Sequence, residues 1–296
     1  MVNRPHISVV MATYNGERFL RQQLNSLCDQ EFKADEIVVS DDHSSDQTIQ
    51  ILEEYNSILA YTANHGKRGV ISNFKNAASR AKTGNYMAFA DQDDLWLSNK
   101  LSASMDMLLR SEDKSLPCMV YSDPIVINNE DEVSAQSLWT ILGFNKYQHK
   151  LETILFGNPA GGCTMLINPE LAKYISTIPD DSYMHDAWLT LCAYTFGKAI
   201  VMKEQVLLYR QHDSNVTFSN DYKQTSRFKR ILKEVKSAIS GRNTLFAEQF
   251  VFVKQFYTYF REEIPEDKKR IFESFLNLEN ASYLKKKLAF RKAAKQ

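Results

Sequence analysis

The stretch NYMAFADQDDLWLSNKL, residues 85–101, decides how this sequence is expected to fold. Residues 86–90 are apolar without alternation, which is typical of a strand buried on both faces of a sheet. Three acids follow within four residues, Asp91, Asp93 and Asp94, and a helical pattern comes next. A buried strand, a polar loop and a helix together form the repeating unit of a parallel α/β sheet. Carboxylates this close together repel one another unless something neutralises them.

The same alternation of strand and helix runs through the first 123 residues. It predicts a mostly parallel, doubly wound central sheet with right-handed crossovers, in which ligands bind beyond the carboxyl ends of the strands. Polar residues follow four of the expected strands at that point, at 13–15, 41–42, 64 and 91–94. The other expected strands cover 6–12, 36–40, 58–63 and 119–123, and the expected helices cover 17–30, 47–55, 70–81 and 101–110.

Beyond residue 123 the pattern is less regular. We expect a turn between short strands at 128–132, a glycine-rich loop, strand and helix within 159–175, a helix at 184–197, and two short strands within 198–212. From residue 222 the pattern is helical to the end, with a break near Pro265. The sequence therefore predicts an α/β body, 1–221, followed by a basic helical C-terminal region, 222–296.

Charge is distributed unevenly along the chain. The 296 residues carry no formal net charge, which argues against a general nucleic-acid binder, and 44% of them are apolar, which allows a sizeable core. The segment 222–296 holds 18 Lys and Arg against 8 Asp and Glu, so the body before it is correspondingly acidic. An acidic body and a basic tail indicate two surfaces with different partners, unless the tail merely exposes a solvated basic face.

The four cysteines, Cys28, Cys118, Cys163 and Cys192, are widely spaced and form no CxxC pair. This spacing argues against a zinc knuckle or a dithiol redox site, and their apolar surroundings are typical of buried free thiols. We find no secretory signal and no apolar run near the roughly 18 residues that span a bilayer. A reducing cytoplasm is therefore the expected location.

The acids at 91–94 predict a metal–diphosphate site. Aspartate-rich loops suit hard cations such as Mg²⁺ or Mn²⁺, which share their remaining coordination with substrate phosphates. A D-x-D tripeptide is a weak signal by itself, because aspartates also cap helices and form turns. The sequence has neither GxxxxGK[ST] nor GxGxxG, so a P-loop and a dinucleotide-binding fold are not supported.

Five stretches together resemble the inverting family 2 glycosyltransferases, which have a GT-A fold. The variant with DQDDLW, MHDxW and YRQHxxNV is most similar to bacterial rhamnosyltransferases of polysaccharide biosynthesis. The resemblance implies a catalytic domain at 1–221, with a nucleotide-sugar half at about 1–123 and an acceptor half at about 124–221. The stretches are VVMATYNGERFLRQQLNSLCDQ (9–30), IVVSDDHSSDQT (37–48), NHGKRGVISNFKNAASRAKTGNYMAFADQDDLWLSNKL (64–101), MHDAWLTL (184–191) and LYRQHDSNV (208–216).

The resemblance implies a role for the residues that follow the first two strands. Ala12, Thr13 and Tyr14 match the loop that lines the nucleotide base, with Tyr14 as a stacking partner. Asp42, with Asp41 beside it, matches the acid that accepts a hydrogen bond from the pyrimidine N3–H. Uracil and thymine both offer that donor, so this contact does not separate UDP from dTDP sugars.

The resemblance also implies roles around the acidic loop. Gly69 and Asn73 lie in the segment that skirts the nucleotide. Asp91 matches the acid near the ribose and the metal, and Asp93 matches the ligand of a Mn²⁺ or Mg²⁺ cofactor. Asp94 either helps with the sugar or caps the next helix.

The acceptor half supplies the expected base. Asp186 matches the family's general base, although an acid at a helix start is also explained by capping. Trp188 would form a wall for a sugar ring or belong to the core. Arg210 suits diphosphate oxygens and His212 suits the metal shell, although an isolated histidine is more often structural.

The implied function is an inverting hexosyltransferase, moving L-rhamnose from dTDP-rhamnose to a growing cell-surface glycan. Within the class, UDP-glucose or UDP-galactose is the alternative donor. A nucleotidyltransferase with Mg²⁺ on the aspartates is a different class, disfavoured because MATYNGER offers one glycine and one arginine. A non-catalytic glycan-binding protein would be expected to lack the D-x-D or the base, and both are present.

The segment 226–239 resembles a helix that lies on an anionic membrane. Membrane contact would suit a polyprenyl-diphosphate-linked acceptor and a peripheral position at the inner face of the cell membrane. The alternative is a helical subdomain packed on the catalytic domain or on a second copy in a homo-oligomer. The apolar residues on one face of this helix are Phe228, Ile231, Leu232, Val235 and Ile239.

Overall fold

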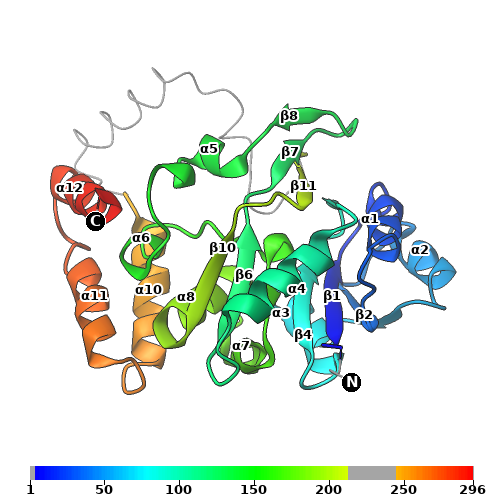
Figure 1. Ribbon diagram of the computed structural model, residues 1–296, viewed down its shortest axis with the longest axis horizontal. Coiled ribbons are helices and arrows are strands. Elements are labelled where there is room, and N and C mark those ends of the chain that lie inside the picture. Colours follow the sequence, from blue (N-terminus) through cyan, green and yellow to red (C-terminus); the bar gives the residue numbers. More distant parts are fainter. Residues whose placement is uncertain (1–3, 213–244, 296) are drawn as a thin grey trace.

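The computed structural model describes residues 4–212 and 245–295. A seven-stranded sheet forms its centre, with the strand order β10-β6-β9-β4-β1-β2-β3 (Figure 1). All neighbouring pairs are parallel except those of β9, which runs antiparallel between β4 and β6. The predicted mostly parallel α/β sheet is therefore confirmed. The strands are β1 (Ile7–Thr13), β2 (Glu36–Asp41), β3 (Ala60–Ala63), β4 (Tyr86–Ala90), β6 (Cys118–Ser122), β9 (Leu166–Ile167) and β10 (Lys198–Met202).

Both faces of the sheet are buried, which explains the uninterrupted apolar strands. In β1, Val10 belongs to the core on one face, whereas Val9 and Met11 belong to the core on the other. Helix α3 (Val70–Arg80) covers the Val10 face, and α1 (Leu20–Cys28) and α4 (Lys100–Ser111) cover the opposite face. Helix α2 (Thr48–Glu54) follows β2, as predicted. The doubly wound arrangement thus follows from strand periodicity.

A second, four-stranded sheet was not predicted, although short strands were expected beside the turn at 128–132 and within 198–212. Its order is β5-β11-β7-β8. The helix expected at 101–110 is confirmed as α4, whereas residues 95–96, for which no strand was predicted, form β5 because they pair with β11. This long-range pairing ties the acidic loop to the segment that carries Arg210 and His212. The strands are β5 (Leu95–Trp96), β7 (Ile125–Ile127), β8 (Val133–Ala135) and β11 (Leu207–Arg210).

In the described part of the predicted acceptor half, several short helices surround one long helix, α8 (His185–Phe196). Nine of the twelve residues of α8 are buried, so it is a core helix and not an amphipathic surface helix. It ends at Gly197, where a Cβ would collide with the backbone of Pro117. The other elements are α5 (Leu138–Leu142), η1 (Phe144–Lys146), α6 (Leu151–Ile154), η2 (Gly162–Thr164), α7 (Pro169–Ala172) and η3 (Lys173–Thr177).

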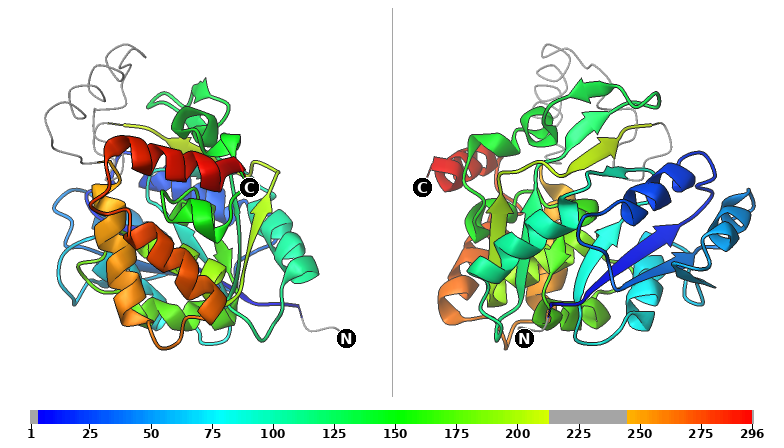
Figure 2. Two further views of the ribbon diagram at one scale, coloured as in Figure 1. Left: turned by 90° about the vertical axis from the view of Figure 1, so that its left-hand side faces the viewer. Right: turned by 45° about the vertical axis from the view of Figure 1, so that its right-hand side comes forward.

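Three C-terminal helices pack against this half (Figures 1 and 2). They are α10 (Ala247–Tyr259), α11 (Glu266–Leu276), which begins after Pro265 as expected, and α12 (Tyr283–Lys295). Trp188 is fully buried, and its ring lies 5.1 Å from that of Phe256, so core packing is the correct one of its two interpretations. The helix expected at 226–239 lies outside the described residues. Every helix in the described part of the chain is too short or too polar to cross a membrane.

Candidate active site

Two cavities meet at the carboxyl ends of the strands. The larger cavity, about 930 Å³, lies beyond β1 and β4, where the strand order reverses. The smaller cavity, about 500 Å³, contains Asp186. The two cavities share Asp91, Met184 and Tyr209. Nine predicted site residues line the larger cavity: Ala12, Thr13, Tyr14, Asp42, Gly69, Asn73, Asp91, Asp93 and His212.

The adjacent acids after β2 have different environments. Asp42 lines the larger cavity, and its two oxygens accept hydrogen bonds from Asn64 Nδ2 and Gly69 N, both at 2.8 Å. Each carboxylate oxygen has two lone pairs, so Asp42 can still accept from a ligand. Asp41 is buried away from the cavity and accepts from Thr13 Oγ1 at 2.7 Å and Ser44 N at 2.8 Å. Asp41 therefore fixes the turn after β2, and of these two acids only Asp42 lines the larger cavity.

Asn73 presents a buried oxygen without a partner. Its Nδ2 donates to the backbone oxygen of Thr13 at 3.0 Å, which fixes the orientation of the amide. Its Oδ1 has no hydrogen-bond partner within the described part of the chain, and the residue is only 2% exposed. An unsatisfied buried acceptor costs on the order of 1–3 kcal/mol. A ligand hydroxyl or N–H in the larger cavity would satisfy this oxygen.

Gln92, which the sequence reasoning missed, clamps the loop that carries Tyr14. Tyr14 N donates to Gln92 Oε1 at 2.8 Å, and Gln92 Nε2 donates to Tyr14 O at 3.0 Å. This paired amide contact holds the loop after β1 against the loop after β4. The Tyr14 ring remains 51% exposed and so can stack on a planar group. The only signal in the sequence was the amide between two aspartates of D-Q-D.

The acidic loop brings Asp93 and His212 together, as the sequence predicted. His212 Nε2 lies 2.7 Å from Asp93 Oδ2. The pKa of Asp91 is raised to about 7, chiefly by burial and in smaller part by the negative charges of Asp93 and Asp186. A divalent cation would relieve this repulsion, and carboxylates with an imidazole form a fitting ligand set for Mn²⁺ or Mg²⁺.

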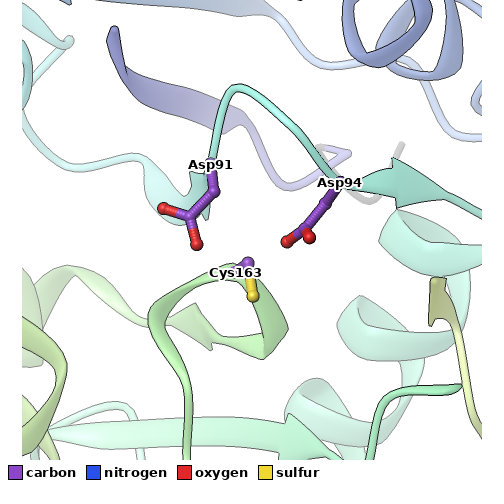
Figure 3. Close-up of side chains that lie close together, drawn as sticks. All are labelled: Asp91, Asp94 and Cys163. Atoms are coloured by element: carbon purple, nitrogen blue, oxygen red, sulfur yellow. The ribbon is translucent and has the colours of Figure 1, made fainter. Parts of the chain in front are cut away.

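Asp94 and Arg210 are both fully buried and line neither cavity. Asp94 Oδ1 accepts from the backbone N–H of Arg210 at 3.0 Å, so it anchors β11. The capping interpretation of Asp94 is wrong, because α4 begins only at Lys100 with Asn99 at its N-cap. Figure 3 shows the Asp94 carboxylate directed toward Cys163, on the same side of the loop as that of Asp91.

The Arg210 guanidinium donates hydrogen bonds to other groups of the protein. Its Nε donates to Asp93 O at 2.8 Å, and its Nη1 donates to Asn128 O and to the Asp131 carboxylate. A contact between Arg210 and a diphosphate therefore stays a prediction. Arg18 and Arg68 are exposed and line the larger cavity, and the sequence reasoning missed both.

Asp186 faces the smaller cavity from the first turn of α8. Its Oδ2 accepts from Gly162 N at 3.0 Å and its Oδ1 from Ala187 N at 2.6 Å. Burial raises the pKa of Asp186 to about 6, although these two N–H groups oppose the shift. Gly162 can approach this closely only as glycine, because a Cβ there would lie 2.7 Å from His185 Nε2. A carboxylate with a pKa near neutrality can serve as a general base.

Comparison with known proteins shows which family this chain belongs to. The profile described as "Glycosyl transferase family 2" matches residues 8–169, which hold all the residues of the larger cavity up to Asn129. The chain belongs to glycosyltransferase family 2. Among curated relatives, the dTDP-rhamnosyl transferase RfbG of Shigella flexneri is 30% identical over 72% of this chain and 77% of its own. WfgD of Escherichia coli, named a UDP-Glc:alpha-D-GlcNAc-diphosphoundecaprenol beta-1,3-glucosyltransferase, is 27% identical over 75% of this chain and 83% of its own.

Solved structures of glycosyltransferases support the same fold. The mannosyltransferase PcManGT of Pyrobaculum calidifontis, in complex with GDP-Man and Mn²⁺, superposes with a TM-score of 0.62 at 18% identity, covering 99% of this chain and 74% of the other. TarS 1–349 of S. aureus with UDP-GlcNAc gives 0.59 at 17% identity, covering 98% and 90%. The predicted GT-A fold is thereby confirmed, and the protein is a family 2 glycosyltransferase of glycan biosynthesis.

Proposed function

We propose that this glycosyltransferase transfers a hexosyl residue with inversion, from a nucleotide diphosphate sugar in the larger cavity to an acceptor hydroxyl in the smaller one. One observation carries the proposal. The larger cavity, lined by most of the predicted nucleotide-sugar residues, joins at Asp91 a cavity that contains a half-buried carboxylate of raised pKa, Asp186. Donor and acceptor would meet from opposite sides of this junction, as direct displacement requires.

The donor would be held by groups at four strand ends. Tyr14 would stack on the base, Asp42 would accept the N3–H, and Asn73 Oδ1 would accept a donor from the nucleoside. Asp91, Asp93 and His212 would hold Mn²⁺ or Mg²⁺. The cation would neutralise negative charge on the leaving diphosphate.

Asp186 would act as the general base. It would take the proton of the acceptor hydroxyl while that oxygen attacks the anomeric carbon on the face opposite the diphosphate. The N–H groups of Gly162 and Ala187 hold the carboxylate in one orientation, so its free lone pairs point to a fixed place. The attack breaks the bond between the anomeric carbon and the diphosphate oxygen, and inversion results from the single displacement.

For the donor we propose dTDP-rhamnose, with UDP-glucose or UDP-galactose as the alternative. The relative RfbG is named a dTDP-rhamnosyl transferase, whereas WfgD is named for UDP-Glc. The test incubates the purified protein with Mn²⁺ or Mg²⁺ and a panel of nucleotide sugars and measures the released nucleotide diphosphate. Release from dTDP-rhamnose alone supports the proposal. Release from a UDP sugar alone contradicts the donor, and no release from any sugar, with or without acceptor, contradicts the function.

For the acceptor we propose a growing glycan on a polyprenyl diphosphate. The smaller cavity extends from Asp186 to apolar and aromatic side chains, among them Trp139, Phe156 and Phe290, which fits an apolar chain. Helix α12 exposes Leu284 (69%) and Leu288 (61%) beside Lys and Arg, which fits an anionic bilayer. Co-sedimentation with vesicles that contain anionic lipid tests membrane contact, and equal recovery with neutral vesicles contradicts it.

A further inference from the structure

A thiol and two carboxylates converge beneath the loop after β4 (Figure 3). One ligand atom each of Asp91, Asp94 and Cys163 lies within 4.8 Å of the other two. Cys163 comes from η2, in the acceptor half, whereas both aspartates belong to the donor side. Asp94 is fully buried and Cys163 is 3% exposed. The transfer mechanism above uses neither Asp94 nor Cys163.

One oxygen of Asp94 in this cluster and the nitrogen of the nearby Lys100 are buried without a hydrogen-bond partner in the described residues. Asp94 Oδ2 has none within residues 4–212 and 245–295, although its other oxygen is bonded to β11. Lys100 Nζ has none within the same residues and lies 4.3 Å from the centroid of the Trp96 ring. A buried carboxylate oxygen without a donor is costly. The free oxygen of Asp94 is therefore available to a cation.

The mixture of ligands determines which cation fits. Thiolate sulfur favours Zn²⁺ and similar soft ions over Mg²⁺, whereas carboxylates bind both kinds. Ligand atoms around one tetrahedral Zn²⁺ lie about 3.5 Å apart. The ligand atoms of the three side chains would therefore have to move up to about 1 Å closer to one another. With Lys100 as ammonium, two carboxylates, one thiolate and a divalent ion sum to zero charge. Asp91 lines both cavities, so water could reach an ion bound beside it and take the fourth coordination position.

We propose that Asp91, Asp94 and Cys163 form a second cation site, which takes a thiophilic ion such as Zn²⁺ and inhibits transfer when it is filled. The site shares Asp91 with the expected diphosphate metal site, but its other two ligands are Asp94 and Cys163 in place of Asp93 and His212. Filling it withdraws Asp91 from the larger cavity and so lowers donor binding. The thiol proton is released when the ion binds. The proposal has two halves. The binding half, that the ion binds to these three side chains, is independent of the proposed function. The inhibition half, that the bound ion lowers transfer, rests on it.

Binding is tested on the full chain by titration with Cd²⁺ in excess Mg²⁺, following the ultraviolet charge-transfer absorbance of a metal–thiolate bond. We expect one equivalent per chain for the wild type. Cys163→Ser should abolish the band, and Asp94→Asn should weaken binding at least tenfold. Cys192→Ser is the matched control, since Cys192 is equally buried but lies in α8, and it should titrate like the wild type. Circular dichroism checks that each variant is folded.

The binding half is overturned if the band persists in Cys163→Ser or is absent from the folded wild type. Inhibition is measured as the Zn²⁺ concentration that halves each variant's own transfer rate at fixed Mg²⁺. We expect that concentration to rise at least tenfold in Cys163→Ser and to stay unchanged in Cys192→Ser. Equal inhibition of all three proteins overturns the inhibition half. If the wild type transfers no sugar, the proposed function fails, while the Cd²⁺ result still decides the site.

Discussion

The larger cavity is lined mainly by loops at strand ends within the first 93 residues, whereas the smaller cavity draws its lining from segments between Asp91 and Phe290. In the larger cavity, amide and carboxylate groups hold each other in place, as Gln92 does for the Tyr14 loop. In the smaller cavity, two carboxylates, Asp186 and the shared Asp91, lie among mainly apolar side chains. Under the proposed function, donor recognition depends on loops from the N-terminal third of the chain, whereas the acceptor surface depends on how distant segments pack together.

The first test separates chemistry from binding. Asp186→Asn should lower kcat by about 10³-fold, because the amide cannot accept the acceptor proton. Donor affinity should stay within about twofold of the wild type, since Asp186 lines only the smaller cavity. Steady-state kinetics and donor titration by calorimetry measure the two quantities. Retention of full transfer by the variant would remove Asp186 as the base.

The second test acts on the larger cavity. Asp93→Asn should weaken metal-dependent donor binding by about 10²-fold, because the carboxylate expected to hold the cation beside His212 is lost. Calorimetry with the nucleotide sugar, with and without Mn²⁺, measures the effect. Ser98→Ala, an exposed change beyond β5, serves as the control. Donor binding that does not respond to the cation in wild type or variant contradicts the metal site.

The third test acts on the acceptor side alone. Phe290→Ala should raise KM for a polyprenyl-diphosphate acceptor about tenfold, because the ring lines the smaller cavity. The donor KM should not change. An exposed α10 substitution, Val251→Ala, is the matched control with the same acceptor, since Val251 lines neither cavity. An equal rise in donor KM would show that the two cavities are not separable in this way.

Much of the larger cavity was predictable from the sequence. Uninterrupted apolar runs identified the parallel strands of the sheet. Residues that directly follow those strands, such as Asp42 and Asp93, were therefore expected to lie together at its carboxyl edge. The resemblance added roles that spacing alone could not supply. Asn73 fits the same logic, because its place on α3 faces the edge of β1.

The remainder depends on contacts between distant segments, which periodicity does not encode. Arg210 looks like a ligand-binding residue in the sequence, but it is buried against residues 79 to 188 positions away. Cys163 looked like an ordinary buried thiol until η2 placed it under the acidic loop. The aromatic lining from α10 and α12 likewise requires the C-terminal helices to fold back onto the acceptor half.

The pH dependence of transfer tests the central claim most directly, that Asp186 takes the proton of the acceptor hydroxyl in the smaller cavity. Its pKa is raised to about 6, so the group is a base above that pH and loses this capacity as the pH falls through 6. At saturating donor and Mn²⁺, kcat/KM for the acceptor should fall tenfold per pH unit below an apparent pKa of about 6. A rate that stays flat down to pH 4.5 would contradict the account.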